Sequence, residues 1–137
     1  MAKKKAKNKS PTPKLSVPNN PVVMFERFTV EIHNDLRMFI LDSHCYSKDD
    51  DLGLHILFPD EKQDWSFKGN WIATTSFHCR LEWEVGYLEF DSFKSAPDFV
   101  TNYCGNQTCI WSARQDGVYL NNAAGEQVFY NYWEMIR

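Results

Sequence analysis

Apolar residues recur along this chain with a period of two. Phe28, Val30 and Ile32 alternate with polar neighbours. From Phe77 to Val85 every second residue is apolar, and the residues between are charged or polar. A period of two places successive side chains on opposite faces of an extended chain, so both runs predict strands with one face in a core.

Further short strands are predicted by the same reasoning. Within Arg37–Tyr46, the residues 38–41 are apolar on both faces, which is typical of a central strand. One face of the run 52–58 carries Leu52, Leu54, Ile56 and Phe58. The remaining predicted strands are Trp65–Phe67, Tyr87–Phe93, Cys109–Ala113, Val118–Leu120 and Gln127–Trp133.

Turn-forming residues separate these runs. Asn34-Asp35, Pro59-Asp60 and the pair Asp116-Gly117 are turn signals, and the last predicts a two-residue hairpin turn. Pro97, after Ser95-Ala96, stands where the start of one short helix tolerates proline. About eight short strands without long helices indicate an all-β fold, an antiparallel sandwich or barrel.

Composition divides the chain into two parts. With 137 residues, 43% hydrophobic and 15% aromatic, it is large and apolar enough for one folded domain. Residues 1–24 are rich in lysine and proline and bury too little surface to fold, so we predict a disordered tail followed by a domain over 25–137. No apolar run reaches the 18 residues of a membrane span, so we expect no membrane insertion.

Charge is distributed unevenly between these parts. Residues 1–20 hold six lysines and no acid, which leaves nine basic and eighteen acidic residues, a net charge of −9, in the remainder. Binding to nucleic acid requires a basic surface that neutralises phosphates. We therefore expect no nucleic acid among the partners of the domain.

Four cysteines, Cys45, Cys79, Cys104 and Cys109, favour two disulfides, because their spacing fits a zinc site poorly. Cys45 shares a strand face with Leu41, and Cys79 is on an inward face, which favours the pairs Cys45–Cys79 and Cys104–Cys109. Sequence alone leaves the other two connectivities open. Asn106, in an Asn-Gln-Thr sequon between the last two cysteines, is a candidate glycosylation site.

Several motifs follow one another in a characteristic order. They are VEIHNDL at 30–36, HCYSKDDDLGLH at 44–55, WSFK at 65–68, TTSFHC at 74–79, CIW at 109–111 and DGVY at 116–119. In this order, and with all four cysteines, they resemble the plant self-incompatibility protein S1 family. The resemblance extends from about Phe28 to the C-terminus.

The resemblance implies a small β-sandwich with two disulfides that is secreted, its signal peptide having been removed. Founding members of the family are ligands secreted by the stigma and recognised by a pollen membrane protein. For this chain the resemblance implies an extracellular signalling polypeptide in reproduction or defence, recognised by a cell-surface receptor protein. We expect a monomer that is not an enzyme and needs no cofactor.

Candidate catalytic and metal-binding residues have simpler interpretations. Three consecutive aspartates at 49–51 point in different directions, so we interpret them as turn carboxylates that bind backbone N–H groups rather than as a calcium site. Glu82 and Glu84 share a strand face, but a glycosidase pair requires a cleft. Histidines without metal-site spacing, which we interpret as polar-face residues, are His33, His44, His55 and His78.

Tryptophans support one alternative function, a carbohydrate-binding module that stacks exposed aromatic rings on a glycan. We expect Trp83 and Trp111 in the core and Trp71, beside Gly69-Asn70, at the surface. The other two tryptophans are Trp65 and Trp133.

Recognition by a receptor is expected to use loops, because strands must repeat a core pattern while loops vary freely. The loops we favour are Lys48–Gly53, Pro59–Asp64, Ser95–Asn102 and Asn121–Gln127. Their polar residues proposed for recognition are Lys48, Asp49, Asp50, Asp51, Asp60, Glu61, Asn121 and Asn122.

Overall fold

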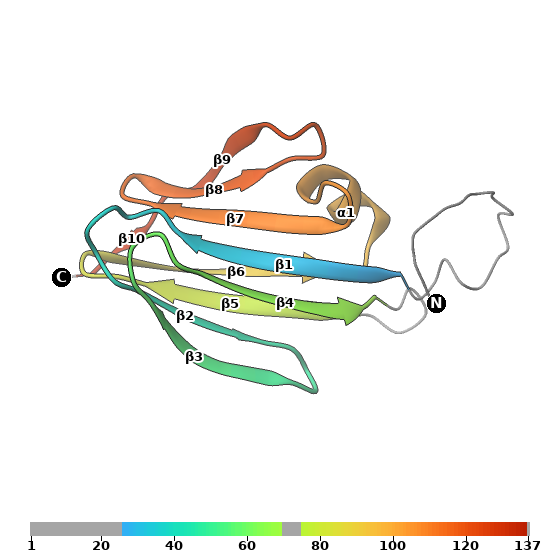
Figure 1. The fold of residues 1–137 in the computed structure, drawn as a ribbon, viewed down its shortest axis with the longest axis horizontal. Coiled ribbons are helices and arrows are strands. Elements are labelled where there is room, and N and C mark those ends of the chain that lie inside the picture. Colours follow the sequence, from blue (N-terminus) through green and yellow to red (C-terminus); the bar gives the residue numbers. More distant parts are fainter. Residues whose placement is uncertain (1–25, 70–74, 137) are drawn as a thin grey trace, which may run out of the picture.

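Two five-stranded sheets pack face to face in the computed structural model, which describes residues 26–69 and 75–136 (Figure 1). The first sheet has the order β4 (Lys62–Lys68), β1 (Arg27–Asn34), β7 (Thr108–Arg114), β8 (Gly117–Asn121) and β9 (Gln127–Asn131). The second has the order β10 (Glu134–Met135), β6 (Gly86–Lys94), β5 (Ser76–Glu82), β2 (Leu41–Tyr46) and β3 (Asp51–Leu57). The β-sandwich predicted for this chain is confirmed.

The sandwich differs from the prediction in strand number and in one pairing. The described residues form ten strands rather than about eight, and β1 pairs with β7 in parallel. Parallel neighbours need a long connection. Here the strands β2 to β6 and the helix α1 (Pro97–Tyr103) lie between the two strands in sequence. The other strand pairs are antiparallel.

The core forms between the inner faces of the two sheets, as the alternation predicted for β1 and β5. Phe28, Val30 and Ile32 are completely buried. Trp111 of β7 is also completely buried, and its indole N–H donates a 3.1 Å hydrogen bond to the carbonyl of Ser92 on the opposite sheet. A buried Trp N–H usually finds an acceptor, and this bond provides one.

The face predicted for Leu52–Phe58 is wrong. Leu54, Ile56 and Phe58 are exposed, and Leu57 is buried in their place. The pairing of β2 with β3 shifts register between His44 and Tyr46, opposite Gly53, whose φ is +80°. Because side chains alternate with a period of two, a one-residue bulge moves the residues beyond it to the other face.

Two further strand predictions need correction. In Arg37–Tyr46 the strand begins only at Leu41, and Met38 and Ile40 are exposed in the preceding loop. Val85, predicted to face inward, is 38% exposed because β5 ends at Glu82 and the chain turns into β6. Short apolar runs do not distinguish a strand from a loop that packs partly against the core.

Disulfides form as predicted. Cys45 and Cys79 are directly opposed on β2 and β5 and form one bridge inside the core. Cys104 and Cys109 form the second, closing the turn between α1 and β7. The short helix is confirmed as well, with Pro97 at its beginning. No helix in the described ranges is long and apolar enough to span a membrane.

The turn inside the Cys104–Cys109 bridge contains two residues in the left-handed region. Asn106 has a φ of 53° and Gln107 a φ of 64°. Gly105 and Thr108 exchange two backbone hydrogen bonds of 2.9 Å around them, which fixes the conformation. Asn106 is exposed, so the side chain of the sequon is accessible, and its glycosylation stays a prediction.

Replacing Gln107 with glycine is expected to stabilise the fold by about 1 kcal/mol. A residue with a Cβ is destabilised by about that much in the left-handed region, because its Cβ lies too close to the backbone. Chemical denaturation monitored by tryptophan fluorescence measures the difference. Gln107→Ala is the matched control, since alanine keeps the Cβ. An equal gain in both variants would contradict the backbone explanation.

Candidate functional site

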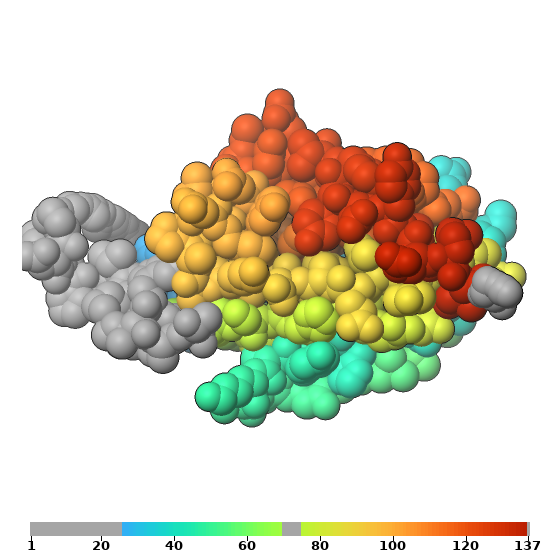
Figure 2. Space-filling model, turned by 180° about the vertical axis from the view of Figure 1, so that it is seen from behind, coloured from blue at the N-terminus to red at the C-terminus, as the bar shows by residue number. Residues whose placement is uncertain are grey.

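Four loops meet at the end of the sandwich opposite α1. They are the β1–β2 loop (35–40), the β3–β4 turn (58–61), the β5–β6 turn (83–85) and the β7–β8 turn (115–116), and we call this region the four-loop end (Figure 1). Seen from behind in Figure 2, the cyan β1–β2 loop lies at the right edge of the molecule, away from the orange helix.

Asn34, the last residue of β1, organises this end through its side chain. It is completely buried, and its amide nitrogen donates 2.9 Å hydrogen bonds to the carbonyls of Phe39 and Leu57. Its amide oxygen accepts a third 2.9 Å bond from the backbone N–H of Leu36. One buried side chain therefore joins the β1–β2 loop to the end of β3.

The backbone of Asn34 adds the β3–β4 turn to the same network. Its N–H donates to the carbonyl of Glu61 over 2.9 Å, and its carbonyl accepts from the N–H of Asp60 over 3.0 Å. The Glu61 carboxylate accepts a 2.9 Å bond from the N–H of Phe58, closing the turn on itself. The turn is thus positioned by backbone bonds on both sides.

The β7–β8 turn is tied to the β1–β2 loop by three contacts. The N–H of Asp35 donates to the carbonyl of Ala113 over 2.9 Å, and the Asp35 carboxylate accepts a short hydrogen bond from the Ser112 hydroxyl. The Gln115 amide donates to the carbonyl of Leu36 over 3.0 Å. These bonds hold loops from both sheets in one fixed arrangement.

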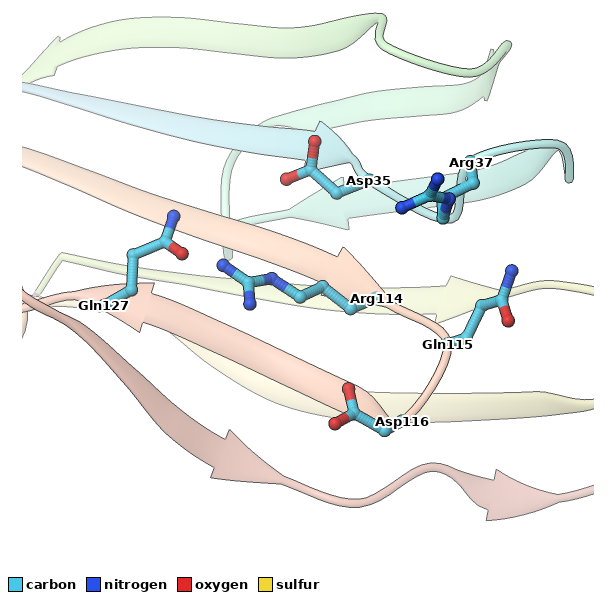
Figure 3. Close-up of a pocket in the computed structure, with 6 residues that line it drawn as sticks. All are labelled: Asp35, Arg37, Arg114, Gln115, Asp116 and Gln127. Carbon is cyan, nitrogen blue, oxygen red and sulfur yellow. The ribbon is translucent and has the colours of Figure 1, made fainter.

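A first cavity of about 520 Å³ lies beside the β1–β2 loop and the β7–β8 turn and is also lined by residues of β7 and β9 (Figure 3). It is lined by Asp35, Arg37, Arg114, Gln115, Asp116 and Gln127. In Figure 3 the Arg114 side chain extends between Asp35 and Asp116. Neither arginine of the cavity forms an ion pair with a carboxylate in the described part of the chain.

Arg114 is held in place by contacts with its neighbours. Its guanidinium lies 4.2 Å from the ring centroid of Tyr119, and its Nε donates a 3.4 Å hydrogen bond to the Ser112 hydroxyl. The Tyr119 hydroxyl donates to Asp116 over 2.8 Å, and this bond raises the pKa of the phenol. The arginine therefore presents an unpaired charge on a fixed aromatic support.

A second cavity, of about 410 Å³, lies where the other part of the β1–β2 loop meets the β5–β6 turn. It is lined by Met38, Phe39, Ile40, Asp42, Glu82, Trp83 and Glu84. Glu82 and Glu84, first considered as a glycosidase pair, thus open into one cavity together with a third carboxylate. Phe39 and Trp83 form its aromatic part, with ring centroids 5.2 Å apart in an edge-to-face arrangement.

The residues proposed for recognition do not form a single site. Asp60 and Glu61 lie at the four-loop end, and Asp60 lines a third cavity with Asp35 and Arg37. The proposed residues of the β2–β3 turn and the β8–β9 loop lie at the other end, which also carries α1; they are Lys48, Asp49, Asp50, Asp51, Asn121 and Asn122.

Sequence reasoning did not propose Arg37 or Arg114, although the turn signal Asn34-Asp35 marked their neighbourhood. Asn122, which it did propose, is used inside its own loop. The Asn122 amide oxygen accepts hydrogen bonds from the N–H groups of Ala124 and Glu126, over 3.0 and 2.9 Å.

Of the three aspartates of 49–51, Asp51 binds a backbone N–H group through its side chain, as predicted for a turn. Asp51 accepts a 2.9 Å bond from the N–H of Gly53 and a 2.7 Å bond from the His44 ring. These bonds, that of Gly53 first, lower the pKa of Asp51. Among the described residues no group of three metal-binding side chains comes together.

The histidines lie on polar faces, as predicted; His78, for example, contacts Asp91.

Replacing His44 with glutamine is expected to raise the pKa of Asp51 only part of the way to its usual value, because the Gly53 donor remains. The pKa of Asp51 is lowered in the folded state, so its contribution to stability is present above the unfolded pKa and is lost as pH falls through the folded one. A carboxyl NMR titration measures the shift. His55→Gln is the control, because His55 contacts the carbonyl of Leu52 instead; an equal shift there would contradict the assignment.

The fold and the four-loop end together define a β-sandwich with two disulfides, whose cavities lie where the loops meet residues of the strands. The chain belongs to the plant self-incompatibility protein S1 family, whose model matches residues 29–133. The family resemblance of the sequence motifs is thereby confirmed.

Relatives in Arabidopsis thaliana support this assignment. S-protein homolog 2 is 36% identical over 113 residues, covering 81% of this chain and 70% of the relative. S-protein homolog 1 is 37% identical over 93 residues, covering 67% of this chain and 61% of the relative.

A solved structure of SPH (self-incompatibility protein homologue) proteins, described as a family of small, highly stable, secreted proteins from plants, has the same fold. It matches with a TM-score of 0.61 at 18% identity, over 81% of this chain and 97% of that one.

Proposed function

We propose that this chain is a secreted, non-enzymatic signalling polypeptide that a cell-surface protein recognises through the four-loop end. The observation that carries the proposal is the exposure of apolar side chains on loops that are otherwise tightly hydrogen-bonded. Met38 is 78% exposed, Phe58 55% and Ile40 47%. Exposed apolar groups beside polar ones are typical of interaction sites.

Rigidity of these loops supports the proposal. The network around Asn34 fixes the β1–β2 loop before any partner arrives. A surface that is already ordered loses little conformational entropy on binding, so its contacts contribute more fully to affinity. Unpaired Arg37 and Arg114 nearby add donors that match carboxylates of a partner.

Secretion is supported by the two disulfides and by family membership. Both bridges are formed and no cysteine of the chain is free. Disulfides of this kind persist in oxidising compartments, chiefly outside the cell. The structurally similar SPH proteins are described as secreted.

A binding experiment tests the proposal directly. Fluorescently labelled protein is expected to bind intact plant protoplasts saturably, and protease treatment of the cells is expected to abolish binding. Met38→Ala/Ile40→Ala is expected to weaken binding about tenfold or more, as for two apolar anchors of an interface. The matched control is Leu54→Ala/Val128→Ala, which removes exposed apolar groups from β3 and β9. Equal loss in both variants, or none in the first, would refute the assignment of the four-loop end.

The carbohydrate-binding alternative gains no support from the tryptophans that the structure describes. Trp83, Trp111 and Trp133 are buried, as predicted for the first two, and Trp65 is half-buried. Trp71, the tryptophan expected at the surface, lies outside the described residues. Stacking on a sugar requires exposed rings, so these four tryptophans do not favour a carbohydrate-binding function.

A further inference from the structure

We infer that the second cavity of the four-loop end, which we call the acidic cavity, receives a lysine or arginine side chain of the partner protein. The acidic cavity is lined by Met38, Phe39, Ile40, Asp42, Glu82, Trp83 and Glu84. The inference rests on the proposed function, because it names the chemistry of the partner at that end.

Charge in this cavity has one sign. All of its charged lining residues, Asp42, Glu82 and Glu84, are carboxylates. Glu82 forms an ion pair of 3.0 Å with Arg80, but Arg80 is shared with Glu89 at 2.9 Å. Within the described ranges, Asp42 and Glu84 make neither an ion pair nor a side-chain hydrogen bond.

The strand register makes this arrangement costly without a ligand. Asp42 of β2 is directly opposite Glu82 of β5. Directly opposed residues on antiparallel strands have Cβ atoms roughly 5 Å apart, and like charges in that position destabilise the sheet. A cation between the two carboxylates turns this repulsion into two attractive interactions. The bare cavity therefore has a site of excess negative potential that a bound cation relieves.

The aromatic and apolar lining selects the kind of cation. Phe39 and Trp83 place an edge-to-face pair of rings, 5.2 Å between centroids, beside the carboxylates. Rings of this kind attract ammonium and guanidinium groups, and apolar walls accept the methylene stem of lysine or arginine. Met38 and Ile40 extend the apolar surface outward, where a partner backbone would lie. A metal ion would use only the carboxylates, whereas a basic side chain uses the whole lining.

An NMR titration tests the cation chemistry. N-acetyl-lysine N-methylamide is expected to shift the indole N–H of Trp83 and the amides of residues 38–42 saturably, and the uncharged norleucine analogue is not. Asp42→Asn/Glu84→Gln is expected to weaken lysine binding about threefold to fivefold, the range for exposed ion pairs. Asp49→Asn/Asp50→Asn removes two charges at the opposite end and serves as the control. Equal shifts with norleucine, or unchanged binding in the first variant, would overturn the inference.

Stability of the variants separates binding from folding. Asp42→Asn removes the repulsion from Glu82, so its denaturation midpoint is expected to rise rather than fall. A lower midpoint would show that Asp42 stabilises the empty fold, and would overturn the argument from register.

Binding to protoplasts then identifies the source of the cation. Asp42→Asn/Glu84→Gln is expected to weaken binding to the cell surface, and the lysine amide is expected to compete with it. If the lysine amide binds in the titration while binding to protoplasts is unchanged in the variant, the cation is a free small molecule and the assignment to a partner side chain is wrong. If the unmodified protein does not bind protoplasts at all, the proposed function fails, and the titration still tests the cavity.

Discussion

Replacing Asn34 with leucine is expected to lower the free energy of unfolding by about 3–5 kcal/mol, because it leaves buried polar groups without partners. The asparagine side chain donates hydrogen bonds to the carbonyls of Phe39 and Leu57 and accepts one from the N–H of Leu36, each 2.9 Å long. Leucine has a similar volume and none of these bonds. Guanidinium denaturation monitored by tryptophan fluorescence measures the change.

The control for this prediction is Asn102→Ala, because Asn102 is exposed on α1 and none of its side-chain atoms makes a hydrogen bond to the described residues. We expect the free energy of unfolding of that variant to lie within about 0.5 kcal/mol of the value for the unmodified protein. If Asn34→Leu lowers the free energy of unfolding by less than about 1 kcal/mol, then water or loop movement provides hydrogen bonds for the three former partners of the Asn34 side chain. The network would then not fix the four-loop end, and the rigidity argument for recognition would fail.

Asn34 also shows where sequence reasoning reaches its limit. Asn-Asp is a sound signal for a turn, and a turn follows β1. The partner that gives Asn34 its importance is Leu57, 23 residues further along the chain. Local residue preferences carry no information about such a partner. Arg37 and Arg114 line one cavity for the same reason: the topology, not the local sequence, places the β1–β2 loop beside the end of β7.

Alternation predicted buried faces well where a strand has neighbours on both sides. β1 and β5 are such strands, and their apolar residues are buried as predicted. β3 is an edge strand with a bulge, and there the same reasoning chose the wrong face. A period of two also does not tell whether two paired strands run parallel or antiparallel, because both kinds of strand have this period. The parallel pairing of β1 with β7 was therefore not predictable from the pattern.

Replacing both Cys45 and Cys79 by alanine is expected to lower the free energy of unfolding by about 4 kcal/mol. The same replacement of Cys104 and Cys109 is expected to lower it by about 2 kcal/mol. The difference follows from loop length. The first bridge joins residues 34 apart in sequence and the second residues 5 apart. A longer closed loop removes more conformational freedom from the unfolded chain, so its bridge stabilises the fold more.

The comparison of the two double variants isolates this effect, because all four cysteines are buried and each variant removes the same atoms. Thermal and guanidinium unfolding measure how much each double variant lowers the free energy of unfolding relative to the unmodified protein. Equal losses would mean that packing around the sulfur atoms outweighs chain entropy. A loss of about 4 kcal/mol is a large part of the stability of a domain of this size. The fold would then depend on an oxidising compartment, which is the physical link between the Cys45–Cys79 bridge and the secretion proposed for this chain.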